Sequence, residues 1–216
     1  MLYSILKRCM DLVLSSFLLL LFSPLLILTS IAIKLESPGP VFYTPTRIGK
    51  GGKHFKMFKF RSMKMYRIDG QFVHAHEVLK KDEHLLSEYK KNSYKLINDP
   101  RVTRVGRFIR RFSIDEMPQF LNVLKGEMSI IGPRAYLPNE LVEQQKVYPE
   151  TKKYVKSLLL VKPGITGFWQ VSGRSEINFD KRIQMDAEYA ERRSIVYDIL
   201  ILIKTPYAMI VGRGAV

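Results

Sequence analysis

Two neighbouring acids stand out in the stretch SIDEMPQF, which runs from Ser113 to Phe120 of a strongly basic chain. Asp115 and Glu116 stand just ahead of Pro118. Such a pair can begin a helix, because acids favour the positive end of the helix dipole. It can also ligate a divalent cation or attack a phosphoryl group. The residues alone leave both readings open.

The proline favours one helix start over another. Ser113 followed by Glu116 matches the S-x-x-E capping box. In that register Pro118 is the fifth helical residue, and its missing N–H costs a helical hydrogen bond. With Asp115 as the N-cap, Pro118 is the third helical residue and loses no bond. We therefore expect the helix to begin at Asp115.

An arginine stripe leads into the acid pair. Arginines recur at helical spacing ahead of it, with one more beside the stripe: Arg101, Arg104, Arg107 and Arg111, then Arg110. A solvated basic face is the usual meaning of such a stripe, but this one runs directly into two carboxylates, which favours an anion site. Arg110 and Arg111 are expected to keep Asp115 ionised. An ionised carboxylate at a cationic helix start suits a phosphoryl acceptor or a Mg²⁺ ligand.

The composition agrees with an anionic partner. The chain has 216 residues, and 35 Lys and Arg against 20 Asp and Glu give a formal charge of +15. This charge favours phosphates, nucleic acid or an acidic membrane surface, without choosing among them. Cys9 is the only cysteine, which excludes a disulfide framework and a cysteine-based zinc site.

An apolar segment near the N-terminus determines where the acid pair and the arginines lie relative to a membrane. No residue from Leu12 to Ile33 is charged, and a straight helix of that length would span roughly 33 Å, close to a bilayer core of about 30 Å. One interpretation is an ordinary spanning helix. The other is a re-entrant helix, because Pro24 after Ser23 predicts a bend and both flanks are basic, which favours the cytoplasmic side for each.

The body that follows is punctuated by proline and glycine. Residues 36–63 alternate like short strands between turns and predict a basic hairpin, or alternatively a solvated edge strand. The helix after the acid pair is expected to end at Gly126. A short strand then leads to the turn at Gly132-Pro133. The loop from Val161 to Arg174 holds the single tryptophan, and residues 195–203 predict a packed or interfacial helix.

The order of these motifs resembles one family. They are a basic LKR, an apolar helix broken at Ser-Pro, SPGPVFYTPTRIG, FKMFKFRSM, DPRVTRVGRFIRRFSIDEMPQFLNVLKGEMSIIGPR and KPGITGFWQVSGR. Together they resemble the bacterial sugar transferases, monotopic polyprenol-phosphate phosphoglycosyl transferases, over nearly the whole chain. The charged stretch before DPRVTR resembles the branch with undecaprenyl-phosphate galactose or glucose phosphotransferases. We expect a member that lacks the extra N-terminal membrane domain of the larger ones.

The resemblance implies a mostly helical α+β fold in two parts. Residues 1–35 would form a re-entrant membrane helix broken at Ser23-Pro24. Residues 36–216 would form a cytoplasmic catalytic domain with interfacial helices and a small β element. The protein would lie in the bacterial inner membrane, with its catalytic domain facing the cytoplasm.

The resemblance also implies a two-step reaction. Asp115 would attack the β-phosphorus of a UDP-sugar, expel UMP and form a covalent phosphosugar-aspartate. Undecaprenyl phosphate would then accept the phosphosugar, the first membrane step of exopolysaccharide, lipopolysaccharide or capsule biosynthesis. Asp115 and Glu116 would hold Mg²⁺, with Glu116 acting as a metal ligand or as a proton acceptor.

Matching motif positions supply the remaining site residues. The residues implied to bind substrate are Lys59, Arg110, Pro133, Arg134, Gln170 and Arg174. Ala135 stands where the family has the last proline of a Gly-Pro-Arg-Pro turn, which bears on the rigidity of that turn and not on Arg134 itself.

The expected partners are the UDP-sugar donor, the undecaprenyl phosphate acceptor and membrane lipids, with no nucleic acid, and the family is compatible with a homodimer. The sequence leaves two alternative functions open. One is a single-pass membrane enzyme of another phosphate class, such as a lipid phosphatase. The other is a basic, non-enzymatic membrane adaptor, which leaves the acid pair and the glycine-rich loops unexplained.

Overall fold

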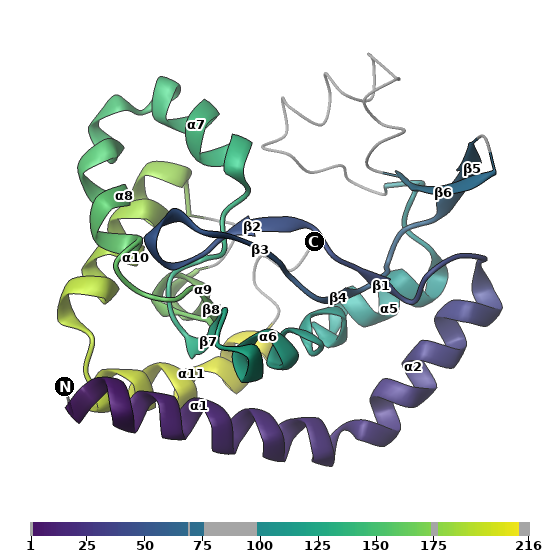
Figure 1. The fold of residues 1–216 in the computed structure, drawn as a ribbon, viewed down its shortest axis with the longest axis horizontal. Helices are drawn as coiled ribbons and strands as arrows, with labels where there is room; N and C mark the ends of the chain where they lie inside the picture. Colours follow the sequence, from purple (N-terminus) through teal and green to yellow (C-terminus); the bar gives the residue numbers. More distant parts are fainter. Residues whose placement is uncertain (1, 69, 76–98, 174–176, 212–216) are drawn as a thin grey trace.

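The computed structural model of the chain describes residues 2–68, 70–75, 99–173 and 177–211. Within these residues the fold is mostly helical α+β, as predicted, and the strands pair only two at a time. Figure 1 shows two N-terminal helices running beneath the rest of the molecule, with the strands and most other helices above them.

The apolar N-terminal segment forms two helices. α1 spans Leu2–Leu21 and α2 spans Ser23–Glu36, with a bend of 61° between them. Pro24 has no N–H to give to the carbonyl of Leu20, and the Ser23 hydroxyl donates to that carbonyl instead, at 2.8 Å. Among the described residues no single helix is long and apolar enough to cross a membrane, but the bent pair meets that test by length and composition. The predicted break at Ser23-Pro24 is confirmed.

A polar stripe on α1 faces the rest of the protein. Lys7, Asp11 and Ser15 recur every four residues and are all buried. Lys7 Nζ lies 3.0 Å from a carboxylate oxygen of Asp198 and donates to a carbonyl of β7 (Ser129–Ile131) at 3.0 Å. Asp11 accepts from a backbone N–H of the same strand, also at 3.0 Å. Charged side chains therefore fix α1 to the body.

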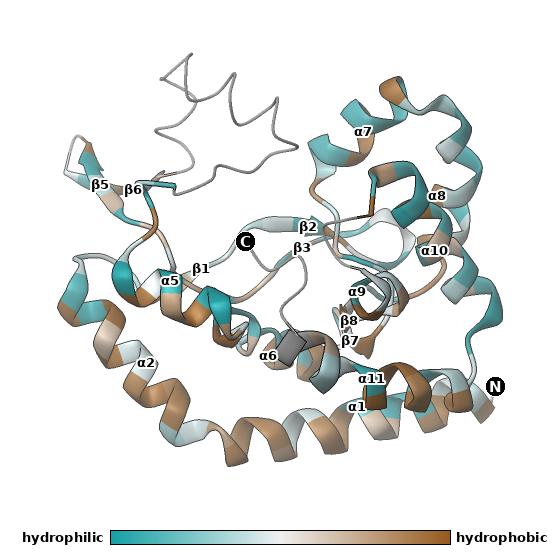
Figure 2. Cartoon of the chain, turned by 180° about the vertical axis from the view of Figure 1, so that it is seen from behind, coloured by the Kyte–Doolittle hydropathy of each residue, from teal (hydrophilic) through white to brown (hydrophobic). Residues whose placement is uncertain are grey.

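The other faces of these helices are apolar and exposed. The large hydrophobic residues exposed on α1 and α2 are Leu2, Ile5, Leu6, Leu12, Val13, Phe17, Leu20, Leu21, Ile27, Leu28, Ile31 and Leu35. The predicted helix at residues 195–203 is confirmed and is longer: α11 spans Ile195–Val211 and exposes Val196, Ile199, Leu200 and Ile203. Figure 2 shows these hydrophobic segments along one side of the molecule.

A buried arginine fixes the end of α2. Arg61 is 2% exposed, and its guanidinium donates to three backbone carbonyls between Ile33 and Pro38. A cation there complements the negative end of the helix dipole. Glu36 accepts from the first backbone N–H groups of α5 (Arg104–Arg111). The exit from the helix pair is thus joined to the segment that leads to the acid pair.

The segment after α2 forms the predicted basic hairpin, but Pro45 divides it into two short antiparallel ladders, because proline has no N–H to donate. One ladder pairs β2 with β3, and the other pairs β1 with β4. A second hairpin pairs β5 with β6. The elements are β1 (Phe42–Tyr43), β2 (Thr46–Ile48), η1 (Lys50–Gly52), β3 (His54–Lys56), β4 (Lys59–Phe60), β5 (Met65–Ile68) and β6 (Gln71–His74).

Two loops of the C-terminal half approach each other closely. β7, the predicted strand before the Gly132-Pro133 turn, pairs in parallel with β8 (Gly164–Thr166). A Cβ on Gly164 would lie 2.1 Å from the backbone nitrogen of Gly132, a separation that only glycine permits. The remaining helices are η2 (Ile114–Glu116), α6 (Gln119–Lys125), α7 (Pro138–Val147), η3 (Pro149–Thr151), α8 (Lys152–Leu158), α9 (Phe168–Ser172) and α10 (Phe179–Arg192).

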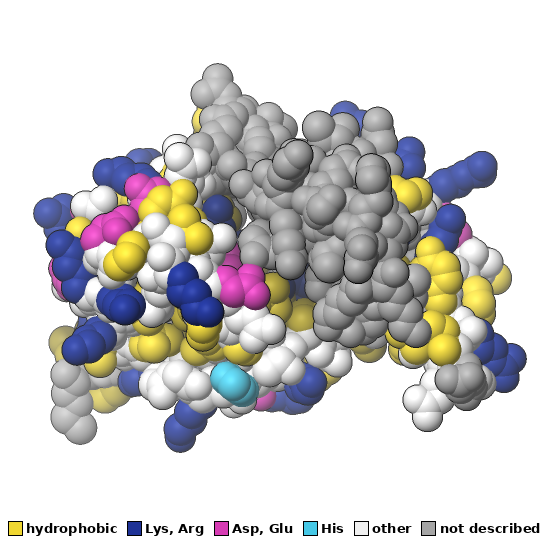
Figure 3. Space-filling view, turned by 90° about the horizontal axis from the view of Figure 1, so that it is seen from above, with side chains coloured by type: hydrophobic (Ala, Val, Ile, Leu, Met, Phe, Trp, Pro, Cys, Tyr) yellow, Lys and Arg dark blue, Asp and Glu magenta, His cyan; other side chains and the backbone are white. Residues whose placement is uncertain are grey.

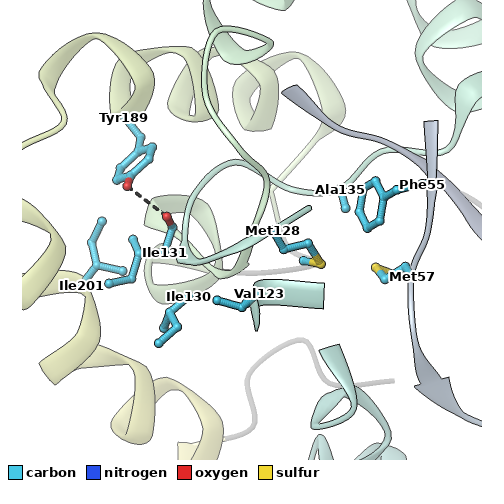
Figure 4. Packing of buried hydrophobic residues seen from close by; sticks show 9 residues of the cluster. All are labelled: Phe55, Met57, Val123, Met128, Ile130, Ile131, Ala135, Tyr189 and Ile201. Carbon is cyan, nitrogen blue, oxygen red and sulfur yellow. Dashed lines mark hydrogen bonds between the residues drawn. The ribbon is translucent and has the colours of Figure 1, made fainter. Parts of the chain in front are cut away.

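One hydrophobic cluster joins the hairpin to the C-terminal half. β3, α6, β7, α10 and α11 all contribute to it, so residues far apart in the sequence pack around the loop after β7 (Figure 4). Its buried members are Phe55, Met57, Val123, Met128, Ile130, Ile131, Ala135, Tyr189 and Ile201. As predicted, α6 ends at Gly126, which adopts the left-handed conformation with φ 81°.

Candidate active site

The acid pair lies in a turn of its own between α5 and α6. η2 ends at Glu116, and α6 begins at Gln119 with Pro118 as its N-cap. The expected helix start at Asp115 is therefore wrong, because Asp115 lies in the 3-10 turn before the helix. The alternative start is also absent, because the Ser113 side chain makes no capping hydrogen bond. The cause is the left-handed backbone of Ser113, with φ 55°, which redirects the chain after α5.

Ile114 fixes this turn against α2. It is 8% exposed and packs in a cluster with Ile33 of α2, Phe60 of β4 and Ile109 of α5. Asp115 follows directly in the chain. The acid pair is therefore placed beside the end of α2 by hydrophobic contacts that join four elements.

Lys59, the first residue of β4, bridges the two acids. Its Nζ donates to Glu116 Oε1 at 2.6 Å and lies 4.0 Å from Asp115 Oδ2. The Asp115 side chain is 13% exposed, whereas that of Glu116 is 39% exposed. Asp115 is the deeper acid, and Glu116 is the more accessible one.

Burial and nearby cations set the ionisation of the pair. Burial raises the pKa of Asp115 to about 6, although Lys59 and Arg110 act in the opposite direction. Desolvation also opposes ionisation of Glu116, but the charge and hydrogen bond of Lys59, together with the charges of Arg134 and Arg47, lower the pKa of Glu116. Arg110 favours the ionised form of Asp115, as expected, but Lys59 has the larger effect, and burial outweighs both. Asp115 is the weaker acid because it is more buried and lies farther from Lys59.

A polar cleft opens beside the pair. Three cations line it with one carboxylate, which favours a ligand that carries more than one negative charge. Sequence reasoning missed Arg47 and Gln119 as site residues. Arg47 reaches the cleft only because β2 pairs with β3, which residue spacing does not reveal. The lining residues are Arg47, Met57, Lys59, Glu116, Gln119, Arg134, Ala135, Gly164, Ile165 and Gln170.

A buried network holds Arg134 at the cleft. Its backbone N–H donates to Asp186 Oδ2 at 3.2 Å, and the Tyr136 hydroxyl donates to the same oxygen at 2.7 Å. Burial raises the pKa of Asp186 to about 7. The Arg134 guanidinium lies 5.5 Å from the centroid of the Trp169 ring, and Arg182 lies 4.9 Å from it. Both arginines thus stack on the single tryptophan.

Four of the eight predicted site residues line this cleft. Asp115 adjoins Glu116 but is more buried and does not line the cleft. Arg110 is half-buried at the end of α5, where its charge acts on Asp115. Pro133 lines an adjacent apolar hollow instead. Arg174 lies outside the described residues. The predicted residues that line the cleft itself are Lys59, Glu116, Arg134 and Gln170.

The donor set at the cleft fits one mode of Mg²⁺ binding. The described residues contain no group of three or more His, Cys, Asp or Glu side chains placed to hold a metal ion. Asp115 and Glu116 are adjacent carboxylates, however, and Mg²⁺ is commonly held by one or two carboxylates together with substrate phosphates. The site therefore fits a metal that arrives with a phosphorylated substrate.

Fold and site together define a protein with a broken apolar helix and a cationic, carboxylate-bearing cleft. The chain belongs to the bacterial sugar transferase family, whose model matches residues 2–212.

Relatives in several bacteria are similar over nearly the whole chain. An undecaprenyl-phosphate galactose phosphotransferase of Salmonella typhimurium is 42% identical over 97% of the chain and 41% of the relative. A UDP-glucose:undecaprenyl-phosphate glucose-1-phosphate transferase of Escherichia coli is 39% identical over 98% of the chain and 41% of the relative. The exopolysaccharide production protein ExoY of Rhizobium meliloti is 38% identical over 97% of the chain and 87% of the relative. The chain thus spans about two-fifths of the first two relatives.

Proposed function

We propose that this protein transfers a sugar-1-phosphate from a UDP-sugar to undecaprenyl phosphate and releases UMP. The observation that carries the proposal is the cleft: Lys59, Arg47 and Arg134 line it together with the accessible Glu116. The buried Asp115 adjoins Glu116, and its carboxylate lies 4.0 Å from the Lys59 nitrogen. The names of the relatives supply the substrate classes. The name of the ExoY relative, an exopolysaccharide production protein, supports a role at the start of such a pathway.

Asp115 is the proposed nucleophile. A carboxylate oxygen forms a bond to the β-phosphorus of the UDP-sugar, and the bond from that phosphorus to the bridging oxygen breaks, so that UMP leaves with the electron pair. An oxygen of undecaprenyl phosphate then attacks the same phosphorus and releases Asp115. With a pKa of about 6, Asp115 is largely ionised near neutral pH and needs no separate base.

The cations hold and neutralise the phosphates. Arg47 and Arg134 line the cleft beside Glu116 and suit the donor diphosphate, because a guanidinium binds phosphate oxygens in pairs. Mg²⁺ held by Asp115 and Glu116 would neutralise developing phosphate charge. The attacking oxygen of the acceptor phosphate carries no proton to remove near neutral pH. This favours metal ligation over proton acceptance for Glu116.

The acceptor's lipid tail accounts for the apolar side of the protein. Ile114 packs on α2, so the acid pair lies beside a helix whose outer face is hydrophobic. The surface on the far side from α1 carries many Lys and Arg side chains (Figure 3). We infer a re-entrant helix pair in the inner membrane with the cleft on its cytoplasmic side, where a lipid-bound phosphate and a soluble nucleotide sugar can meet.

UMP release from a panel of UDP-sugars tests the proposal. The purified protein with Mg²⁺ is expected to release UMP continuously when undecaprenyl phosphate is present. Without acceptor it should release about one equivalent, and intact mass should rise by one phosphosugar. Asp115→Asn should abolish both results, while Lys56→Met, which changes an exposed lysine, should retain them. Failure to release UMP from any donor would refute the proposal, and phosphate release from undecaprenyl phosphate alone would indicate a lipid phosphatase.

A further inference from the structure

Asn122 is a fully buried polar residue for which the reaction above gives no role. It lies in α6, the helix that follows the acid pair, and is 0% exposed. Its amide nitrogen donates to the carbonyl of Lys56 at 2.8 Å and to Glu127 Oε2 at 2.7 Å. Its amide oxygen accepts from the N–H of Phe58 at 2.8 Å. The partners fix the amide orientation, because the backbone N–H only donates and the two oxygens only accept.

These contacts fall where the hairpin loses its own hydrogen bonds. Lys56 ends β3 and Lys59 begins β4, and Pro45 stands opposite the break. Pro45 accepts from the N–H of Met57 at 3.0 Å but has no N–H to return. Because hydrogen bonding alternates along a strand, the backbone groups of Lys56 and Phe58, on either side of Met57, face away from the strand that carries Pro45. The side chain of Asn122 binds both, so α6 holds the outer edge of the hairpin at the break.

The break between β3 and β4 also determines where Lys59 lies. Residues 57–58 let the strand leave the β2 ladder and enter the β1 ladder, and Lys59 follows at once with its 2.6 Å contact to Glu116. The acid pair leads directly into α6, the helix that carries Asn122. The Asn122 amide therefore connects the segment just before Lys59 to α6, the helix that follows Asp115 and Glu116.

Resting on the proposed function, we propose that Asn122 is a positioning residue that sets the placement of Lys59 against Asp115 and Glu116. It touches no substrate and acts through the lysine. The far end of β4 is fixed separately by Arg61. Its backbone N–H donates to the carbonyl of Val41 at 2.8 Å, and its side chain donates to a carbonyl at the end of α2. Loss of the amide therefore lets Lys59 shift while the strand stays paired.

The test compares Asn122→Ala with Lys59→Ala, the double variant, and Thr151→Ala as a control. Thr151 is 1% exposed, and its hydroxyl donates to the carbonyl of Tyr148 at 2.7 Å, so the control also removes a buried polar contact. Asn122→Ala is expected to lower kcat for UMP release by roughly 10- to 100-fold, the range for small misplacement of a reacting group, with a smaller change in KM. Thr151→Ala should lower the melting temperature comparably and leave kcat near wild type.

Non-additivity separates positioning from general destabilisation. If Asn122 acts through Lys59, the double variant should lose no more activity than Lys59→Ala alone. A kcat for Asn122→Ala equal to that of Thr151→Ala, or losses that multiply in the double variant, would overturn the inference while wild-type turnover upholds the proposed function. If the wild type releases no UMP, the proposed function fails and this inference fails with it.

Discussion

Replacing Lys59 with methionine should move the pH dependence of the reaction. The substitution keeps an unbranched side chain but removes the charge 4.0 Å from Asp115 Oδ2. At that distance two unit charges interact by about 1 kcal/mol in water and about 4 kcal/mol at an effective dielectric constant of about 20. One pKa unit corresponds to about 1.4 kcal/mol, so the pKa of Asp115 should rise by roughly 1 to 3 units.

The direction follows from the role of Asp115. The carboxylate must be ionised to attack, so the rate falls as pH drops below its pKa, which is about 6 in the metal-free protein and lower when Mg²⁺ is bound. Without Lys59 the ionised form is less stable, and the fall should begin roughly 1 to 3 pH units above that of the wild type at the same Mg²⁺ concentration. Near neutral pH the variant should therefore be slower than the wild type and should recover part of the loss as pH rises.

The measurement is single-turnover UMP release against pH at fixed, saturating Mg²⁺. Lys56→Met is the matched control, because Lys56 is an exposed lysine at the end of the preceding strand β3 and donates to Thr46 Oγ1 at 2.9 Å. The control should keep the acid limb of the wild type. An unchanged acid limb in Lys59→Met, with measurable activity, would refute the electrostatic role given to Lys59.

Three further outcomes are expected. Gly164→Ala places a Cβ 2.1 Å from the backbone nitrogen of Gly132, so thermal melting in detergent should show destabilisation by about 2 kcal/mol or more, and an unchanged melting temperature would contradict the close approach. Chelation by EDTA should stop UMP release and added Mg²⁺ should restore it, whereas full activity in EDTA would exclude the metal. Cys9 is exposed and is the single cysteine; an impermeant thiol reagent should label it from the cytoplasmic side of inverted vesicles, and ready labelling from the periplasmic side would exclude the re-entrant topology.

Local signals in the sequence predicted the features that depend on one or two residues. Pro24 predicted the bend, Gly126 the end of α6, and the glycine and proline turns the basic hairpin. The predicted start of α6 was wrong because Ser113 adopts a left-handed backbone conformation. The packing of Ile114 against α2 accompanies that turn. A capping pattern in the sequence contains no information about that distant contact.

The site was predicted in part for the same reason. Lys59, Glu116 and Arg134 could be assigned from motifs and do line one cleft. Arg47 and Asn122 could not. Arg47 reaches the cleft through the pairing of β2 with β3, and the side chain of Asn122 meets Phe58, 64 residues earlier. The weaker acidity of Asp115 likewise follows from burial, which depends on the completed fold.

The polar stripe on α1 bears on the order in which the protein is made. Lys7 meets the carbonyl of Ile131, 124 residues later, and Asp11 meets Ser129, 118 residues later. The ribosome therefore releases α1 long before its partners exist. Until then Lys7 and Asp11, one helical turn apart, have chiefly each other as partners. Unpaired charges are costly in lipid, so in the proposed membrane placement α1 reaches its final depth only once the catalytic body has folded. Anchoring and folding would then be a single event.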